Sequence, residues 1–160
     1  MTVFGALAGG VIGTVVLTTA LRGAQELGWT RMDIPFLLGT VFTADRGRAN
    51  AIGYALHFVN GLAFSVAYYG IFAAVGHAGW IFGALLGLVH GAFSGSALVT
   101  ILLPAVHPRM ATRWADAEET PLLEPPGFLL RNYGERTVIW NLVAHMLYGA
   151  IVGGFAAQLH

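Results

Sequence analysis

Three histidines, His57, His90 and His145, lie within long apolar stretches of this sequence. A neutral imidazole carries one hydrogen-bond donor and one acceptor, and its free nitrogen can also bind a metal or a haem iron. Because an apolar environment disfavours the charged imidazolium, we expect these rings to be neutral. Their chemistry suits a hydrogen-bond network, a haem or transition metal, or the carbonyl of a quinone.

Other polar side chains stand three or four residues from each histidine. Residues at this spacing share one face of a helix. The histidines are predicted to lie at matching depths, because His57 and His145 each follow an arginine by nine residues, about 13 Å of helical rise. We therefore predict one buried site. Its predicted members are His57, Asn60, His90, Ser94, Asn141, His145 and Tyr148.

A purely structural network is the first interpretation of these residues, and two kinds of cofactor are the alternative. His57 and His145 could clamp a haem, and with His90 they could bind Zn, Cu or Fe. No paired-histidine motif makes any one metal specific. No carboxylate lies within the apolar stretches, which disfavours a carboxylate-rich di-iron site. In the structural interpretation, the same side chains join the helices through hydrogen bonds.

The apolar stretches predict the elements that position these side chains. Of the 160 residues, 56% are hydrophobic and only 10% are charged, whereas soluble domains carry roughly 25% charged residues. A membrane-crossing helix needs about 20 residues. Segments of that length cover approximately 3–21, 50–76, 80–103 and 137–157. The sequence therefore predicts an all-α membrane protein with four transmembrane helices in a single domain, 1–160.

The arginines predict how these helices are oriented. All eight basic residues are arginines, and all lie between the first and second or between the third and fourth apolar segments. The positive-inside rule places loops 22–49 and 104–136 in the cytoplasm and both termini outside. With a formal net charge of zero, the chain offers no basic surface for nucleic acid. The absence of cysteine excludes disulfides and thiolate metal sites.

The two halves of the chain resemble each other in order. The segment 4–13 aligns with 82–91, and the His57–Gly61 pair aligns with His145–Gly149. We predict two parallel helical-hairpin repeats, 1–76 and 79–160, related by an axis along the membrane normal. The loops are predicted to carry short interfacial helices, one starting at Asp33 and one within 121–130. The polar stretch 107–120 is predicted to face solvent.

Glycines recur every four residues on three of the predicted helices. The rows are Gly5, Gly9 and Gly13; Gly83, Gly87, Gly91 and Gly95; and Gly149 and Gly153. Small residues let helix backbones approach closely in lipid, where little hydrophobic force drives association. We expect these faces to pack inside one chain. A homo-oligomer or a larger membrane complex could use one of them instead.

One enzymatic interpretation needs weighing. Gly91-Ala-Phe-Ser-Gly95 with His145 faintly resembles the serine and histidine of the rhomboid intramembrane proteases, in which the serine attacks and the histidine is the base. The rhomboid Gly-x-Ser-Gly pattern is not met, since position 92 is Ala. The chain also has four predicted spans rather than six, with Ser94 in mid-helix. We therefore predict no catalytic residue and favour a protein that is not an enzyme.

The chain as a whole resembles an uncharacterised family of small bacterial four-helix integral-membrane proteins. The resemblance rests on Met32-Asp33 followed by Leu38-Gly39, His57 with Gly61, residues 83–90, and His145-x-x-Tyr148-Gly149. It covers most of the chain except 107–120. It implies a bacterial inner-membrane protein with no known activity. Asp33 is expected either to cap its helix or to hold Arg31 or Arg46.

Three functions remain open at this point. The first is a non-enzymatic inner-membrane protein whose buried His/Asn/Ser/Tyr cluster binds haem or a transition metal. The second is an accessory or scaffold subunit of a larger membrane complex, with a purely structural polar network. The third is a small transporter or proton-conducting element, which the absence of an intramembrane carboxylate disfavours.

Overall fold

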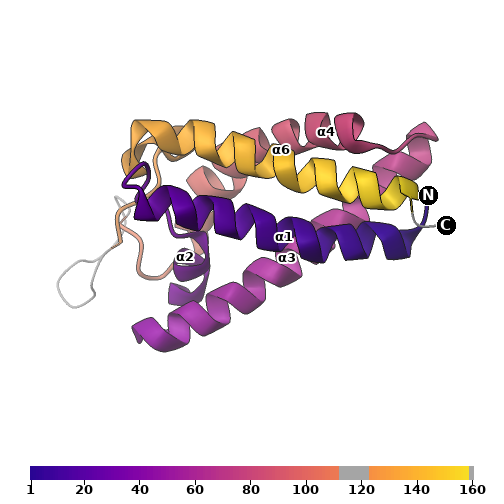
Figure 1. The fold of residues 1–160 in the computed structure, drawn as a ribbon. Helices are drawn as coiled ribbons and strands as arrows, with labels where there is room; N and C mark the ends of the chain where they lie inside the picture. The colour runs from indigo at the N-terminus through magenta and orange to yellow at the C-terminus, as the bar shows by residue number, and fades with distance from the viewer. Residues whose placement is uncertain (112–122, 159–160) are drawn as a thin grey trace.

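The structure, a computed structural model, describes residues 1–111 and 123–158. Within these ranges the chain is helical, with no strand and one isolated bridge between Met110 and Leu123 (Figure 1). The elements are α1 (Val3–Glu26), α2 (Ile34–Thr40), α3 (Arg46–Val75), α4 (Trp80–Phe93), the π-helix η1 (Ser94–Leu102), α5 (Leu103–Val106), the 3₁₀ helix η2 (Phe128–Tyr133) and α6 (Glu135–Gln158). The all-helical prediction is confirmed.

Four helical stretches of the described residues are long and apolar enough to cross a membrane. They are Val3–Glu26, Arg46–Val75, Trp80–Val106 and Glu135–Gln158. The four predicted segments fall on these stretches, although the helices extend a few residues further at most ends. This length and composition are consistent with a membrane protein.

Side-chain caps and a glycine set the ends of the long helices. The Thr2 hydroxyl accepts from the Gly5 amide at the start of α1, and Asp45 accepts from the Arg48 amide at the start of α3. Each cap satisfies an amide that has no partner within its own helix. Gly76 closes α3 with φ 73°, a left-handed conformation that glycine adopts without strain.

Helix α6 packs closely against both α1 and α4. A Cβ added to Gly83 would lie 2.9 Å from the carbonyl carbon of Gly149, and one added to Gly9 would lie 2.8 Å from Cα of Val152. These distances leave no room for a side chain, so the helix backbones touch. Figure 1 shows α6 running alongside α1 over most of its length. The predicted glycine faces therefore lie at contacts within the chain.

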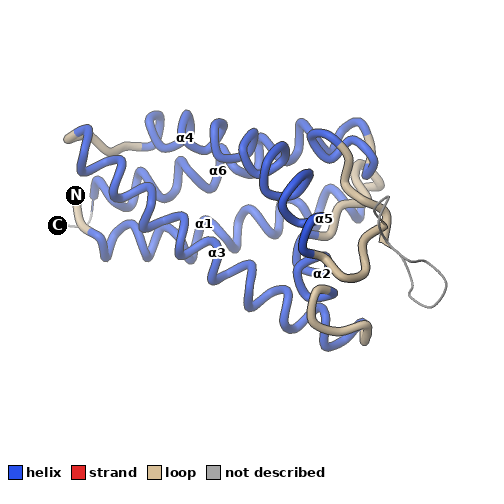
Figure 2. The backbone as a smooth tube through the Cα atoms, turned by 180° about the vertical axis from the view of Figure 1, so that it is seen from behind, coloured by secondary structure: helices blue, strands red, loops and turns tan. Residues whose placement is uncertain are grey.

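Helix α3 follows a different course from the other long helices. Its first half packs on α2, where Gly39 leaves no space for a Cβ beside Ala49, and Gly53 leaves none beside Pro35. Figure 1 shows the N-terminal end of α3 diverging from α6, with α2 between α1 and α3. Figure 2 shows the same divergence from behind, beside α5. The divergence separates α3 from η1 and α5.

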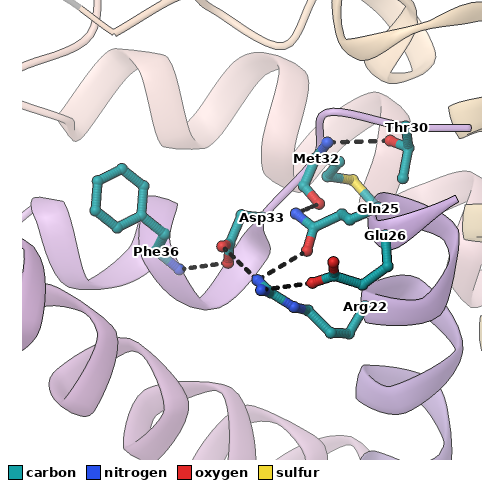
Figure 3. A network of polar contacts seen from close by, with 7 residues as sticks. All are labelled: Arg22, Gln25, Glu26, Thr30, Met32, Asp33 and Phe36. Carbon is teal, nitrogen blue, oxygen red and sulfur yellow. Dashed lines mark hydrogen bonds and ion pairs between the residues drawn. The ribbon is translucent and has the colours of Figure 1, made fainter. Parts of the chain in front are cut away.

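Of three predictions about the loops, the structure confirms one and differs from two. Asp33 caps α2 by accepting from the Phe36 amide at 3.0 Å, so the capping interpretation is confirmed (Figure 3). In the second loop the helix begins at Phe128, later than predicted; positions 121 and 122 lie outside the described residues. The prediction that 107–120 faces solvent is wrong at its start, because His107 and Met110 are buried. Positions 112–120 also lie outside the described residues.

Candidate functional site

A cavity of about 380 Å³ lies among α1, α3, α6 and the segment from α4 to α5, with α2 at one end. Volumes of this size are at the lower end of those that hold small ligands. All seven residues predicted from the sequence line it: His57, Asn60, His90, Ser94, Asn141, His145 and Tyr148. The rest of the lining is mostly aliphatic, together with the hydroxyl of Thr14, the backbone of Gly61 and the ring of Phe64.

The cavity has a polar end and an apolar end. His57 and His145 each lie about ten residues into their helices, which corresponds to about 15 Å of rise and places them near mid-length. The apolar end is nearer the arginine-containing loops. It is formed by Leu17, Leu21, Ile34, Leu38, Leu98, Leu102, Leu103 and Val106. The three histidines therefore lie deeper along the helix axes than the apolar residues of this end.

The hydrogen bonds of His145 fix its tautomer. Its Nδ1 lies 2.8 Å from the carbonyl oxygen of Asn141, one turn earlier in α6. A carbonyl only accepts, so Nδ1 must carry the proton. In a neutral ring the other nitrogen, Nε2, is then a bare acceptor. His145 is 8% exposed and lines the cavity, so Nε2 is an acceptor available to a ligand.

His90 lies against His145 and a group of aromatic rings. The two imidazoles pack edge to face with centroids 4.7 Å apart. Phe64 of α3 lies 3.9 Å from the His90 ring centroid, and the Tyr68 hydroxyl is 3.4 Å from His90 Nδ1. The imidazoles of His90 and His145 therefore pack directly against each other.

His57 has an unmet hydrogen-bonding requirement. Its Nε2 is fully buried and, within the described residues, is the one buried side-chain nitrogen or oxygen without a partner. A buried polar group without a partner costs about 1–3 kcal/mol. Asn60 and Ser94 also line the cavity and make no side-chain hydrogen bond within the described residues. The site thus has hydrogen-bonding capacity that the chain itself does not use.

Asn141 and Tyr148 do use their hydrogen bonds. The Asn141 amide donates to the carbonyl oxygen of Gly91 in α4 at 2.8 Å, and the Tyr148 hydroxyl donates to that of Gly61 in α3. Both side chains are almost fully buried. These bonds join α6 to α4 and to α3, as the structural interpretation of the polar residues predicts for this pair.

The π-helix η1 begins at Ser94. Within it the Thr100 hydroxyl, which has one proton to donate, lies within hydrogen-bond distance of two carbonyl oxygens, that of Gly95 and, at 2.7 Å, that of Gly127 in the following loop. Short π-helical turns occur most often at functional sites, because the wider turn re-aims the side chains that follow. Here η1 supplies Leu98 and Val99 to the cavity wall. The sequence predicted a regular helix at this position.

The cavity opens sideways between α3 and the segment 102–106. Two of its lining residues there are largely exposed, Leu102 at 54% and Val106 at 62%, and Asn60 on α3 is also exposed. Nearer the 76–79 turn the gap is closed by side chains, since the rings of Phe72 and Phe82 lie 5.7 Å apart. The opening is therefore on the side of the bundle, beside the apolar end of the cavity.

The lining limits which chemistry the site can perform. No charged residue lines the cavity. Among residues 1–111 and 123–158, no three His, Cys, Asp or Glu side chains are grouped so that they could hold a metal ion. Within the same residues no hydrogen bond joins Ser94 to His145, the pair that the protease comparison requires. The arrangement suits non-covalent binding of a neutral molecule that forms hydrogen bonds.

The sequence missed the apolar half of the site. Leu98, Leu102 and Val106 read as ordinary lipid-facing residues, and nothing in their spacing distinguishes them. Thr14 also lines the cavity, although its hydroxyl donates to Gly10 of its own helix. Helix α1 carries three threonines, Thr14, Thr18 and Thr19, and nothing in the sequence singles out Thr14 among them.

Comparison of the chain with protein families, curated proteins and solved structures found no match. The function must therefore be argued from the site alone.

Proposed function

We propose that this chain is a multi-pass membrane protein that binds a small, neutral, mostly apolar ligand between its four spans. The observation that carries the proposal is the acceptor Nε2 of His145 at a cavity of about 380 Å³, which Asn60 and Ser94 line without a side-chain hydrogen bond of their own within the described residues. A buried polar atom is normally satisfied by protein, water or ligand. Apolar walls with a few converging polar groups are typical of small-molecule sites.

The competing function is a structural subunit whose polar residues only join helices. Asn141 and Tyr148 favour it, because their hydrogen bonds are complete within the chain. His57, Asn60 and Ser94 favour ligand binding, because they have no such bonds and lie at the same cavity. We give the second group more weight, since an unused cavity would cost packing energy without joining any helices.

The membrane arrangement belongs to the same proposal. We place the protein in a bacterial inner membrane as two parallel hairpin repeats, with both termini outside and loops 22–49 and 104–136 in the cytoplasm. The support is the arginine distribution. Under this arrangement α2 and η2 lie at the cytoplasmic interface, and the opening beside Leu102 faces lipid.

The absence of native cysteine allows a direct test of this topology. Ala44 lies exposed between α2 and α3, and His77 lies exposed in the turn after α3. A membrane-impermeant maleimide applied to intact cells should label His77→Cys, whereas Ala44→Cys should react only after the membrane is opened. The reverse pattern would contradict the proposed orientation.

A pair of neighbouring substitutions tests whether the cavity is occupied. Leu102 lines the opening, whereas Ile101 is 68% exposed and does not line the cavity. Leu102→Trp should block the opening, and Ile101→Trp should add the same ring to the outer surface. Protein purified from its native membrane is then analysed by native mass spectrometry. We expect a bound small molecule in the wild type and in Ile101→Trp, and its loss in Leu102→Trp.

Further measurements on the same material distinguish the alternatives. A Soret band would identify haem, and elemental analysis would identify a stoichiometric metal; either result would replace the neutral ligand by a cofactor. If no molecule is bound to any variant, and His57→Leu raises the melting temperature by removing an unpartnered group, ligand binding is excluded. Stable protein partners that co-purify without any small molecule would favour the accessory-subunit function.

A further inference from the structure

We infer that the ligand is a lipid-soluble phenol of the quinol class, with a ring hydroxyl donating to His145 Nε2 and its tail leaving between α3 and α5. This inference rests on the proposed function, since it names the ligand of the same cavity. Four features of the cavity support it: the hydrogen bond of His145, the order of polar and apolar residues, the aromatic rings at the polar end, and the opening beside Leu102.

The hydrogen-bond direction requires a donor on the ligand. His145 Nδ1 donates to Asn141, so its neutral ring offers only an acceptor at Nε2. A carbonyl oxygen placed there would set two lone pairs against each other, whereas a hydroxyl would donate. A quinol carries hydroxyls at the positions where a quinone carries carbonyls. The site should therefore prefer the reduced, hydroxyl-bearing form.

The order of groups along the cavity excludes a surface-anchored lipid. A phospholipid keeps its charged head at the interface and its tails in the membrane centre. In this cavity the three histidines lie near mid-span, and the end nearest the arginine-containing loops is mostly aliphatic, including Ile34 and Leu38 of α2. No charged side chain lines the cavity to receive a phosphate. A neutral molecule with its polar ring in the membrane centre fits this order.

The rings around the polar end suit a flat aromatic head. Phe64 and His90 lie 3.9 Å apart by ring centroids, and Tyr68 and Tyr148 pack edge to face at 5.7 Å. Phe64, His90 and Tyr148 line the cavity. Aromatic rings pair favourably in stacked and edge-to-face arrangements, by about 0.5–1.5 kcal/mol beyond the area they bury. Asn60 and Ser94 also line the cavity and can meet further oxygens of such a ring.

The opening of the cavity beside Leu102 provides a path for the apolar tail of the ligand. Leu102 and Val106 are the exposed lining residues on the π-helical side. In the proposed orientation they face the lipid, so an isoprenoid or alkyl chain could pass from the cavity into the bilayer without exposure to water. A ligand of this kind would enter from the membrane rather than from either aqueous side.

The test compares three probes that differ in one functional group. Protein in phosphatidylcholine nanodiscs, kept anaerobic, is titrated with decyl-ubiquinol, with decyl-ubiquinone and with the quinol's dimethyl ether, and binding is measured by equilibrium dialysis. Loss of one hydrogen bond to a buried acceptor should weaken binding about tenfold. We therefore expect the quinol to bind about tenfold more tightly than the quinone or the ether.

Two further measurements assign this preference to His145. His145→Phe should reduce it to no more than twofold, whereas His77→Phe, an exposed histidine outside the cavity, should retain it. Because His145→Phe could fail to fold, nitrogen NMR of histidine-labelled wild type provides an independent readout. The His145 Nε2 resonance should shift on addition of the quinol and stay unchanged with the ether.

The outcomes separate this inference from the function on which it rests. Equal binding of all three probes, abolished by Leu102→Trp, would overturn the quinol assignment while supporting a cavity for neutral ligands. Failure of all three probes, with a different molecule retained from the native membrane, would overturn the quinol class alone. Failure of every probe, with no native molecule bound, would overturn both proposals.

Discussion

Gly83 and Gly149 lie backbone against backbone where α4 crosses α6. A Cβ on Gly83 would overlap the Gly149 carbonyl oxygen and come within 3.1 Å of Cα of Gly153. The two helices can approach this closely only because neither carries a side chain at the contact. The contact brings His145 of α6 and His90 of α4 together, and these are the imidazoles that lie 4.7 Å apart at the cavity.

The first prediction concerns this contact. Gly83→Ala should destabilise the fold by about 1–3 kcal/mol, because the added methyl overlaps backbone atoms that cannot rotate away. Gly70→Ala is the matched control, since a Cβ at Gly70 meets nothing within 4 Å. It should be neutral or stabilising by up to about 1 kcal/mol, because alanine favours helix. Equilibrium unfolding in detergent measures the unfolding free energy of both variants. Equal changes in Gly83→Ala and Gly70→Ala would contradict the close contact between α4 and α6.

The second prediction separates the two roles open to Asp33. Its carboxylate caps α2 at Phe36 and lies 3.9 Å from Arg22, not beside Arg31 or Arg46 (Figure 3). Asp33→Ala should cost about 0.5–2 kcal/mol of unfolding free energy, whereas Asp33→Asn should cost only a few tenths, because asparagine caps equally well. If the ion pair with Arg22 matters more than the cap, Asp33→Asn will be as damaging as Asp33→Ala.

The third prediction compares a buried and an exposed link between the two loops. The hydroxyls of Thr30 and Thr137 are 2.6 Å apart and buried. Thr137→Val keeps the shape but removes one partner, which should cost about 1–3 kcal/mol. Arg31 and Glu124 form an ion pair at 3.2 Å with side chains 68% and 47% exposed, so Glu124→Gln should cost less than about 1 kcal/mol. Thermal unfolding measures both variants. A larger drop in melting temperature for Glu124→Gln than for Thr137→Val would contradict this ranking.

The polar half of the site could be predicted because helical geometry is simple. Once the apolar segments are recognised, a residue's depth and face follow from counting residues, and His57, His90 and His145 do reach the same cavity. Whether these histidines bind a metal does not follow from counting residues. Depth and face do not determine which way a ring turns, and His145 turns its Nδ1 towards its own helix.

The apolar half could not be predicted because it depends on packing between segments far apart in the chain. Gly39 and Gly53 let α2 lie directly on the start of α3, which carries that helix away from α5. Within the π-helix, the Thr100 hydroxyl lies 2.7 Å from the carbonyl oxygen of Gly127, 27 residues further along the chain. Nothing in the sequence around Gly39, Gly53 or Thr100 indicates which distant residue each of them contacts.

The last prediction concerns His107, which joins the end of α5 to α2. Its Nδ1 accepts from the Arg109 amide at 3.1 Å, and its Nε2 donates to the Leu37 carbonyl at 3.1 Å and lies 3.2 Å from the Thr40 hydroxyl. Only the neutral ring can accept at one nitrogen and donate at the other. Protonation would remove the acceptor and place a charge beside Arg109.

Burial lowers the pKa of His107 below its ordinary value of 6.5, and Arg109 lowers it further, with partial compensation from the Leu37 carbonyl. The unfolded chain therefore binds a proton more readily than the folded one, so the stabilisation from His107 is complete above pH 6.5 and declines as the pH falls towards the lowered value. We expect His107→Gln to melt at a lower temperature than the wild type at about pH 7.5, with the gap narrowing by about pH 5. Since the other histidines are present in both proteins, the difference between the two melting curves isolates His107. A gap that stays constant or widens on acidification would show that His107 is not held as the neutral ring.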